Sequence, residues 1–186
     1  MIKLEKCIIC SKKNITEKII CKDFTVSGEL FKIVSCETCG FTFTNPRPND
    51  EDLGKYYISN SYISHTNNKK GLFNTLYQTI RLITINRKVK LLKSMRKKGK
   101  VLDIGCGTGE FLNKCKRNGY EIIGSEPSDV ARKQAVKNFD IEVMKSNSFE
   151  KLESKSISII TMWHVLEHIP DIENVLTECS RLIEDN

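Results

Sequence analysis

The second half of the chain alternates short apolar runs with longer mixed segments. The apolar runs, which we interpret as strands, cover residues 101–104, 121–124, 141–144 and 156–162. The segments between and after them, which we interpret as helices, cover residues 110–118, 129–138 and 172–183. Strands that alternate with helices are typical of a parallel sheet with covering helices, and such sheets bind ligands at the carboxyl ends of their strands. The pattern predicts an α/β fold with about four parallel strands.

The first half divides into two blocks. Residues 18–21 and 30–34 are predicted to form a β-hairpin, and residues 45–48, which include two prolines, then interrupt regular structure. From Leu72 to Met95, apolar residues recur close to helical spacing, which predicts one or two amphipathic helices. We therefore expect three consecutive parts: a small N-terminal domain (1–48), a connector with an aromatic loop and a basic helix (49–99), and the first part of a larger sheet domain (100–186).

Composition bounds the class of protein. The chain has 186 residues, of which 39% are hydrophobic and 28% charged, so a packed core is expected rather than wholesale disorder. This length suits one ordinary domain, or one domain with a small appendage. No apolar run reaches the roughly 18 residues of a membrane-spanning helix, and residues 1–6 lack the apolar core of a signal peptide. We therefore expect a cytoplasmic protein that does not enter the membrane.

The net charge of +7 is unevenly distributed. Residues 1–100 carry twenty Lys and Arg against eight Asp and Glu, whereas residues 101–186 carry ten against fifteen. Nine of the basic residues lie in the segment 81–100, where no acidic residue occurs. Such a segment can attract nucleic acid, a nucleotide-linked sugar or another anion. Few aromatic residues are interleaved for base stacking, so we favour a solvated basic face and do not favour nucleic acid as a partner.

Four of the eight cysteines form two C-x-x-C pairs, Cys7 with Cys10 and Cys36 with Cys39, which are separated by 25 residues. Two residues between cysteines allow both thiolates of a tight turn to reach one tetrahedral ion, so the pairs predict a structural Zn²⁺ site in a zinc-ribbon-like domain. Gly40 fits such a turn because a positive φ is often required there. A redox dithiol is the alternative, but neither pair lies in the βαβ context typical of that chemistry.

A glycine-rich loop at residues 105–109 lies between the first predicted strand of the sheet and the helix that follows. A dinucleotide-binding fingerprint would have Gly or Ala next, where this chain has Glu110. Glu110 and the nearby Asp103 would repel a pyrophosphate but suit a cofactor with ammonium and sulfonium charges. Glu126, at the tip of the second strand, is placed to accept hydrogen bonds from ribose hydroxyls. The pattern favours S-adenosylmethionine; a nicotinamide cofactor, or a fold that binds no cofactor, is the alternative.

Three segments carry a resemblance to a known family. The segment 101–109, Val-Leu-Asp-Ile-Gly-Cys-Gly-Thr-Gly, resembles the first motif of class I S-adenosylmethionine-dependent methyltransferases, and 124–127, Gly-Ser-Glu-Pro, resembles their second. The segment 161–168, Thr-Met-Trp-His-Val-Leu-Glu-His, is similar to the one after the fourth strand in a subgroup that includes ubiquinone-pathway and sugar methyltransferases. The paired cysteines resemble those of bacterial methyltransferases with an N-terminal zinc domain, including deoxysugar C-methyltransferases. The resemblance implies a Rossmann-like sheet and S-adenosyl-L-methionine as cofactor.

The resemblance also implies a set of residues around the cofactor. They are Asp103, Gly105, Cys106, Gly107, Gly109, Glu126, Pro127, Asn147 and Trp163. Two positions depart from the family pattern. Ser158 stands where the fourth strand usually has an acid, and Asn147 or Ser148 stands where an acid commonly meets the adenine amino group. The carbonyl of an Asn side chain can still accept that hydrogen bond.

His164 is the candidate catalytic residue. The resemblance places it close to the transferring methyl group, and an imidazole can accept a proton near neutral pH. The segment 164–168 also matches the H-x-x-E-H motif of inverted zinc proteases, but that motif needs a helix and here it directly follows a strand. A divalent-metal site at His164, Glu167 and His168 is a further alternative. In a purely structural role, Glu167 and His168 would anchor the turn through hydrogen bonds.

The class I fold normally has seven strands, and the predicted elements of this chain end after the fourth. Three more strands with their helices and loops would need roughly 70 residues. We therefore expect a fragment whose fourth strand has an open apolar edge and whose turnover is weak or absent.

Together these features predict methyl transfer from S-adenosylmethionine to a small-molecule acceptor, either a sugar or another biosynthetic intermediate. One alternative is a ribosomal-RNA methyltransferase with an N-terminal zinc finger, and the other is a non-catalytic fragment that binds zinc and anions. No D/N-P-P-Y/F segment follows the fourth predicted strand, which argues against methylation of amino groups on DNA bases. The sequence does not indicate an oligomeric state.

Overall fold

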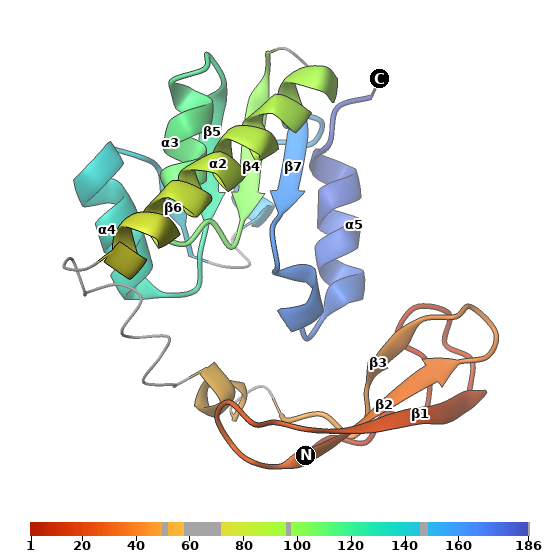
Figure 1. The fold of residues 1–186 in the computed structure, drawn as a ribbon. Coiled ribbons are helices and arrows are strands. Elements are labelled where there is room, and N and C mark those ends of the chain that lie inside the picture. The colour runs from red at the N-terminus through yellow and green to blue at the C-terminus, as the bar shows by residue number, and fades with distance from the viewer. Residues whose placement is uncertain (50–51, 58–71, 96–97, 146–148, 186) are drawn as a thin grey trace. The chain divides into compact units, whose positions relative to one another are not determined.

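The computed structural model describes residues 1–49, 52–57, 72–95, 98–145 and 149–185. The chain forms two compact units, Met1–Lys70 and Gly71–Asn186, each with its own sheet (Figure 1). The division falls inside the segment 49–99 that the sequence assigns to a connector. Among the described residues, no helix is both long and apolar enough to cross a bilayer.

The first unit contains a three-stranded antiparallel sheet in the order β1-β2-β3. Its elements are β1 (Ile15–Lys22), β2 (Leu30–Cys36), β3 (Thr42–Thr44) and a short 3₁₀ segment, η1 (Leu53–Tyr57). The predicted hairpin is confirmed, since β1 and β2 pair antiparallel. Asp23 starts the turn between them, because its carboxylate accepts hydrogen bonds from the backbone N–H groups of Thr25, Val26 and Ser27.

The second unit contains a four-stranded parallel sheet in the order β6-β5-β4-β7. Its strands are β4 (Lys100–Ile104), β5 (Glu121–Ser125), β6 (Val143–Met144) and β7 (Ile159–Met162). Its helices are α2 (Leu72–Met95), α3 (Glu110–Lys116), α4 (Asp129–Phe139) and α5 (Ile172–Leu182), with short 3₁₀ segments η2 (Phe149–Lys151) and η3 (Leu166–His168). The predicted α/β class and the parallel sheet are confirmed.

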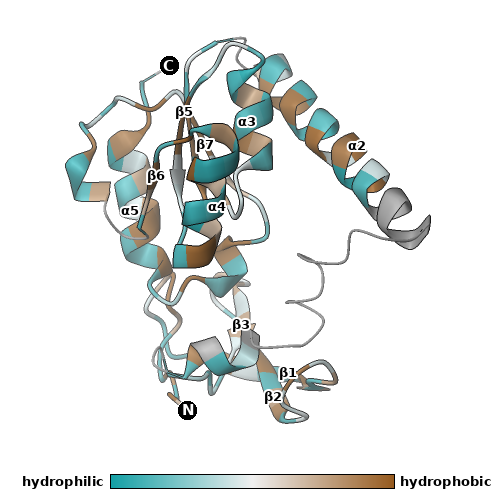
Figure 2. Ribbon diagram, turned by 90° about the vertical axis from the view of Figure 1, so that its left-hand side faces the viewer, coloured by the Kyte–Doolittle hydropathy of each residue, from teal (hydrophilic) through white to brown (hydrophobic). Residues whose placement is uncertain are grey.

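The sheet is buried on both faces, because alternate residues of β4 point to opposite sides. Val101 packs with residues of α2 and α3, and Leu102 packs on the other face with residues of α5. Both side chains are fully buried. Figure 2 shows the apolar residues gathered on the strands, whereas apolar and polar residues alternate along α2. Asp103 lies on the Val101 face, so the sheet turns this carboxyl group toward α2 and α3.

The segment just before β7 is paired on its outer side. After α5 the chain runs back beside this strand, where Ile157 and Ile183 form an isolated parallel bridge. The N–H of Ile157 donates to the carbonyl of Leu182 at 3.0 Å, and the N–H of Glu184 donates to the carbonyl of Ile157 at 2.9 Å. The predicted fourth strand was expected to have an open edge. This expectation was wrong at Ile157, because residues after α5 form backbone hydrogen bonds with it.

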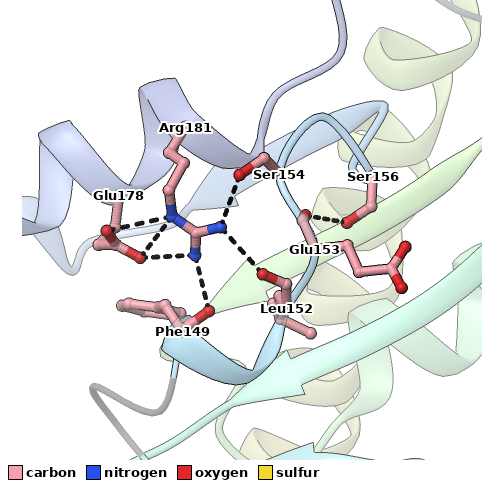
Figure 3. Close-up of polar contacts among 7 residues, drawn as sticks. All are labelled: Phe149, Leu152, Glu153, Ser154, Ser156, Glu178 and Arg181. Carbon is pink, nitrogen blue, oxygen red and sulfur yellow. Dashed lines mark hydrogen bonds and ion pairs between the residues drawn. The ribbon is translucent and has the colours of Figure 1, made fainter.

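Arg181 on α5 fastens the segment that precedes β7 (Figure 3). Its guanidinium donates to the carbonyls of Phe149 and Leu152, at 2.9 Å each. It also donates to Ser154 Oγ at 3.1 Å and pairs with Glu178 at 2.7 Å. A planar group with five donors can make these contacts at once, which a lysine ammonium at the same place cannot. The arginine thus fixes an irregular segment against a helix.

We expect Arg181→Lys to lower the melting temperature by several degrees, because carbonyl groups on the irregular segment lose their donor. Asp185→Asn serves as the control, since it removes only the exposed ion pair of Lys155 with Asp185 and such pairs contribute little. Thermal unfolding followed by circular dichroism measures both variants. Equal melting temperatures for Arg181→Lys and wild type would contradict the fastening role.

Candidate cofactor pocket and four-thiol site

The first unit brings the four predicted metal ligands together. The sulfur atoms of Cys7, Cys10, Cys36 and Cys39 all lie within 4.8 Å of one another. Cys7 Sγ is 3.6 Å from Cys39 Sγ, and Cys10 Sγ is 3.5 Å from Cys36 Sγ. Tetrahedral zinc with bonds of about 2.3 Å places its sulfur ligands about 3.8 Å apart. The number, type and spacing of the donors therefore fit a structural zinc ion.

The two cysteine turns have the same backbone arrangement. Ser11 N donates to the carbonyl of Cys7 at 2.9 Å, and Gly40 N donates to the carbonyl of Cys36 at 2.8 Å. Ser11 and Gly40 both have a positive φ, at 57° and 75°. The positive φ predicted for Gly40 is confirmed, whereas nothing in the sequence signalled the same conformation at Ser11.

Cys36 is placed to be a thiolate. The backbone N–H of Cys39 donates to its sulfur, and this contact is the main cause that lowers the pKa of Cys36 to about 6. The thiolate is the form of cysteine that binds metals.

The alternative metal site is not formed. Within the described part of the chain, the four thiols are the only group of three or more His, Cys, Asp and Glu side chains that could hold an ion. His164 Nδ1 lies 3.9 Å from Glu167 Oε1, and both side chains are largely exposed. His168, the third residue of that hypothesis, does not join them in such a group.

The second unit contains a pocket of about 400 Å³ beside the carboxyl ends of the parallel strands. Its walls come from α2, from the glycine loop with the start of α3, and from the ends of β4 and β7. The lining residues are Ile80, Arg81, Thr84, Ile85, Lys88, Asp103, Gly105, Cys106, Gly107, Thr108, Glu110, Phe111 and Trp163. A pocket of this size is in the range of small-molecule and cofactor sites.

The glycine loop is held against β5 by its own backbone. The N–H groups of Gly105 and Cys106 both donate to the carbonyl of Ser125, at 2.7 and 3.1 Å. A Cβ atom on Gly105 would lie 2.4 Å from Val165 Cγ2, so no side chain fits there. A Cβ atom on Gly107 would meet nothing within 4 Å, so its backbone is open to a ligand. One glycine thus permits packing and the other permits close approach.

Asp103 is the buried charge of the pocket, with only 3% of its surface exposed. Thr161 Oγ1 on β7 donates to its Oδ1 at 2.6 Å. Burial raises the pKa of Asp103 to about 7, although the hydrogen bond from Thr161 and the charge of Lys88 act in the opposite direction. A carboxyl group in this state holds a proton near neutrality unless a cation comes close.

Glu126 connects the tip of β5 to the glycine loop. Its Oε2 accepts from Gly107 N at 2.9 Å, and its Oε1 accepts from Ser128 N at 2.9 Å. The side chain is buried. Arg132 donates to the carbonyls of Glu126 and Pro127 and so fixes the turn that follows.

Two cations of α2 face the pocket, and sequence reasoning treated both as part of a solvated face. Arg81 pairs with Glu110 at 2.7 Å, so the charge of Glu110 is already compensated. Lys88 Nζ lies 4.4 Å from the centre of the Trp163 ring, and burial lowers its pKa. The signal that could have found them is spacing, since residues 81, 85 and 88 lie on one face of a helix.

Trp163 and His164 follow β7 but lie differently. Trp163 lines the pocket and packs edge-on against Phe111, with ring centres 5.7 Å apart. Its buried Nε1 has no hydrogen-bond partner among the described residues. The side chain of His164 is 89% exposed and does not line the pocket, and its φ of 57° is unusual for a residue other than glycine.

The predicted cofactor residues therefore fall into three groups. Five of them line the pocket: Asp103, Gly105, Cys106, Gly107 and Trp163. Three do not line it: Gly109 lies at the end of the glycine loop, and Glu126 and Pro127 follow β5. Asn147, with the alternative Ser148, lies outside the described residues.

We expect Asp103→Asn to stabilise the protein more at pH 8 than at pH 5. The folded state holds a proton on Asp103 up to a pKa of about 7, whereas the unfolded chain releases it near its ordinary value of 3.8. The contribution of Asp103 to stability is therefore complete below pH 4 and is lost as the pH rises through 7. Between pH 5 and pH 8 the free energy of unfolding should fall by on the order of 2 kcal/mol for this reason. Asparagine has no charge to bury and can still accept from Thr161.

Urea unfolding at both pH values measures this difference. Asp140→Asn is the matched control, because it makes the same change at the exposed cap of α4. A gain in unfolding free energy that is the same at pH 5 and pH 8 would contradict the raised pKa.

Comparison with known proteins identifies relatives of this chain. At 32% identity over 92 residues, the chain matches a ubiquinone biosynthesis O-methyltransferase from Vibrio atlanticus, covering 46% of this chain and 39% of that protein. A protein of the same name from Aliivibrio fischeri matches at 30% over 92 residues, with the same coverage. The chain therefore spans only about two fifths of the length of these curated relatives.

Among solved structures, a SAM-dependent methyltransferase from Archaeoglobus fulgidus matches at 27% identity with a TM-score of 0.49, covering 61% of this chain and 54% of that one. Residues 77–186, more than half of the chain, match the family described as "Methyltransferase domain". The predicted resemblance to class I S-adenosylmethionine-dependent methyltransferases is thus confirmed, and the chain belongs to the methyltransferase domain family.

Proposed function

We propose that the chain binds S-adenosylmethionine in the pocket of its second unit and takes part in methyl transfer to a small-molecule acceptor. The observation that carries the proposal is the buried carboxyl group of Asp103, which lies beside an open glycine backbone at the carboxyl edge of a parallel sheet. A carboxyl group whose pKa is raised by burial gains stability when a cation approaches. Family membership supports the same cofactor.

Several groups suit different parts of this cofactor. The open backbone at Gly107 would allow close approach, and the carboxylate of Glu126 has lone pairs left for ribose hydroxyls. Asp103 would favour the cationic end, and the ammonium of Lys88 would pair with the carboxylate of the amino-acid part. The buried Nε1 of Trp163 would gain the acceptor that it lacks among the described residues. When bound, S-adenosylmethionine supplies an electrophilic methyl group on a sulfonium.

For the acceptor we propose a hydroxyl group of a biosynthetic intermediate. The curated relatives are named O-methyltransferases of ubiquinone biosynthesis, which supports an oxygen atom as the methylated position. A sugar hydroxyl is compatible with this chemistry. The two cations that line the pocket, Arg81 and Lys88, belong to a concave site of small-molecule size, so they give no support to a ribosomal-RNA acceptor.

His164 is the proposed general base. It directly follows Trp163, and its imidazole is exposed rather than packed in the hydrophobic core. Its Nδ1 faces the carboxylate of Glu167 at 3.9 Å, which would leave Nε2 to take the proton from the acceptor hydroxyl. The walls of the pocket would hold the acceptor and the cofactor together, so proximity would supply much of the acceleration.

For the first unit we propose a structural Zn²⁺ ion bound by Cys7, Cys10, Cys36 and Cys39. Four thiolates close the coordination shell and leave no position for a substrate. The three strands of this unit bury few apolar side chains, so the ion would hold together a piece that has little core of its own.

We expect isothermal titration with S-adenosylmethionine to give a measurable binding heat and a rise in melting temperature, because a ligand that binds only the folded state stabilises it. Glu126→Gln should weaken binding about tenfold or more, since a hydrogen bond to a charged group is lost. Glu121→Gln, on the exposed start of the same strand, is the control and should bind like wild type. If the wild-type protein gives neither heat nor a thermal shift, the proposed function is overturned.

We expect purified wild-type protein to contain one zinc ion per chain by mass spectrometry and Cys36→Ser to contain almost none. A structural zinc contributes on the order of 10 kcal/mol to the fold around it, so the first unit of the variant should also become sensitive to proteases. Cys21→Ser is the matched control, because Cys21 is an exposed cysteine of β1 outside the four-thiol site. Equal zinc content in wild type and Cys36→Ser would rule out this site.

A further inference from the structure

The described side chains of α2 differ in how they contact the second unit. The C-terminal half is anchored in the core, where Val89 and Leu92 are 4% and 2% exposed. Among residues 78–84, every side chain is exposed except that of Arg81, which is partly buried. Apolar burial therefore holds the C-terminal half of the helix, whereas the described side chains at residues 78–84 add little buried apolar surface.

One polar contact of residues 78–84 crosses the pocket. Arg81 on α2 pairs with Glu110, the first residue of α3, at 2.7 Å. The second carboxylate oxygen of Glu110 accepts from Thr108 Oγ1 at 2.7 Å, which ties the acid to the glycine loop. Arg81, Glu110 and Thr108 all line the pocket. The ion pair thus joins the α2 wall of the pocket to its glycine wall.

The strength of this contact suits a joint that opens. The side chains of Arg81 and Glu110 are 36% and 29% exposed, so water screens the pair. Partly exposed ion pairs contribute little to stability and weaken further in salt. Toward the anchored end, the ammonium of Lys88 over the Trp163 ring makes a second contact between α2 and the rest of the pocket wall. The helix is therefore firmly held beyond Lys88 and only weakly held at Arg81.

We propose that the ion pair of Arg81 with Glu110 is a latch that holds residues 78–84 of α2 over the pocket and sets the rate at which the cofactor enters and leaves. The proposal rests on the proposed binding of S-adenosylmethionine in this pocket. Opening at residues 78–84 requires that this partly exposed ion pair separates while Val89 and Leu92 stay in the core. In this arrangement Glu110 acts on the motion of α2, and Asp103 remains the acid for the cationic end of the cofactor.

The first test needs no cofactor. In the zinc-loaded full chain, Arg81→Gln should speed amide hydrogen exchange at residues 78–84 about two- to fivefold, the range expected when a partly exposed ion pair is lost. Glu110→Gln should do the same. Arg87→Gln is the control, because Arg87 is an exposed arginine of the same helix that does not line the pocket. Unchanged exchange at residues 78–84 in both latch variants would overturn the proposal.

The second test measures cofactor exchange. Trp163 is the single tryptophan of the chain and lines the pocket, so its fluorescence reports binding in a stopped-flow instrument. The dissociation rate of S-adenosylmethionine should rise about two- to fivefold in Arg81→Gln but not in Arg87→Gln. Raising the KCl concentration from 20 to 500 mM should speed dissociation more for wild type than for Arg81→Gln, since only wild type has a pair to screen.

A charge exchange separates a latch from a general loss of structure. The double variant Arg81→Glu with Glu110→Arg restores an ion pair with reversed polarity and should return the dissociation rate toward that of wild type. Failure of this rescue, or equal dissociation rates in wild type and Arg81→Gln, would overturn the latch while leaving cofactor binding intact. If wild type does not bind S-adenosylmethionine at all, the proposed function fails and the hydrogen-exchange result alone decides whether the ion pair holds α2.

Discussion

Burial of the Asp103 carboxyl group is the constraint around which the second unit is arranged. An uncompensated charge inside a protein is strongly disfavoured, so such a group either keeps a proton or collects donors and cations around it. Asp103 does both. Burial raises its pKa to about 7, while the hydrogen bond from Thr161 and the positive charge of Lys88 stabilise its charged form. The donor comes from β7 and the cation from α2. One acid on the central strand therefore links the edge of the sheet to the helix that covers the pocket.

The parallel register makes this arrangement possible. β4 pairs with β5 on one side and β7 on the other, and Asp103 stands between Gly124 and Thr161. Thr161 supplies the hydroxyl donor, and Gly124 supplies space, since a Cβ atom there would lie 2.7 Å from Cys106 Sγ. That space lets the glycine loop fold down onto β5. The open backbone at Gly107 thus depends on the residue that neighbours Asp103 in the sheet.

Local patterns in the sequence were enough to predict the sheet, the hairpin and the four-thiol site, because apolar runs and cysteine spacing carry their own geometry. They also predicted the helix α2, but not which of its faces lines the pocket. The basic residues of this segment were interpreted as a solvated face, whereas the burial of Val89 and Leu92 fixes the rotation of the helix and places Arg81 and Lys88 in the pocket wall. The position of His164 after β7 was predictable, but its exposure follows from a φ of 57° that no local pattern signals.

The charged residues that line the pocket bear on the choice between S-adenosylmethionine and a dinucleotide. The sequence predicted that Glu110 and Asp103 would both repel a pyrophosphate. In the structure, Arg81 already compensates the charge of Glu110. Among the described lining residues, one acid and one base then remain, Asp103 and Lys88. A dinucleotide would bring two phosphate charges to a wall with a single uncommitted cation and a buried acid, and this balance of charge is unfavourable for it. A ligand that carries a carboxylate together with ammonium and sulfonium groups meets both remaining charges. Because Arg81 compensates the charge of Glu110, Asp103 is the acid of the pocket that disfavours a dinucleotide.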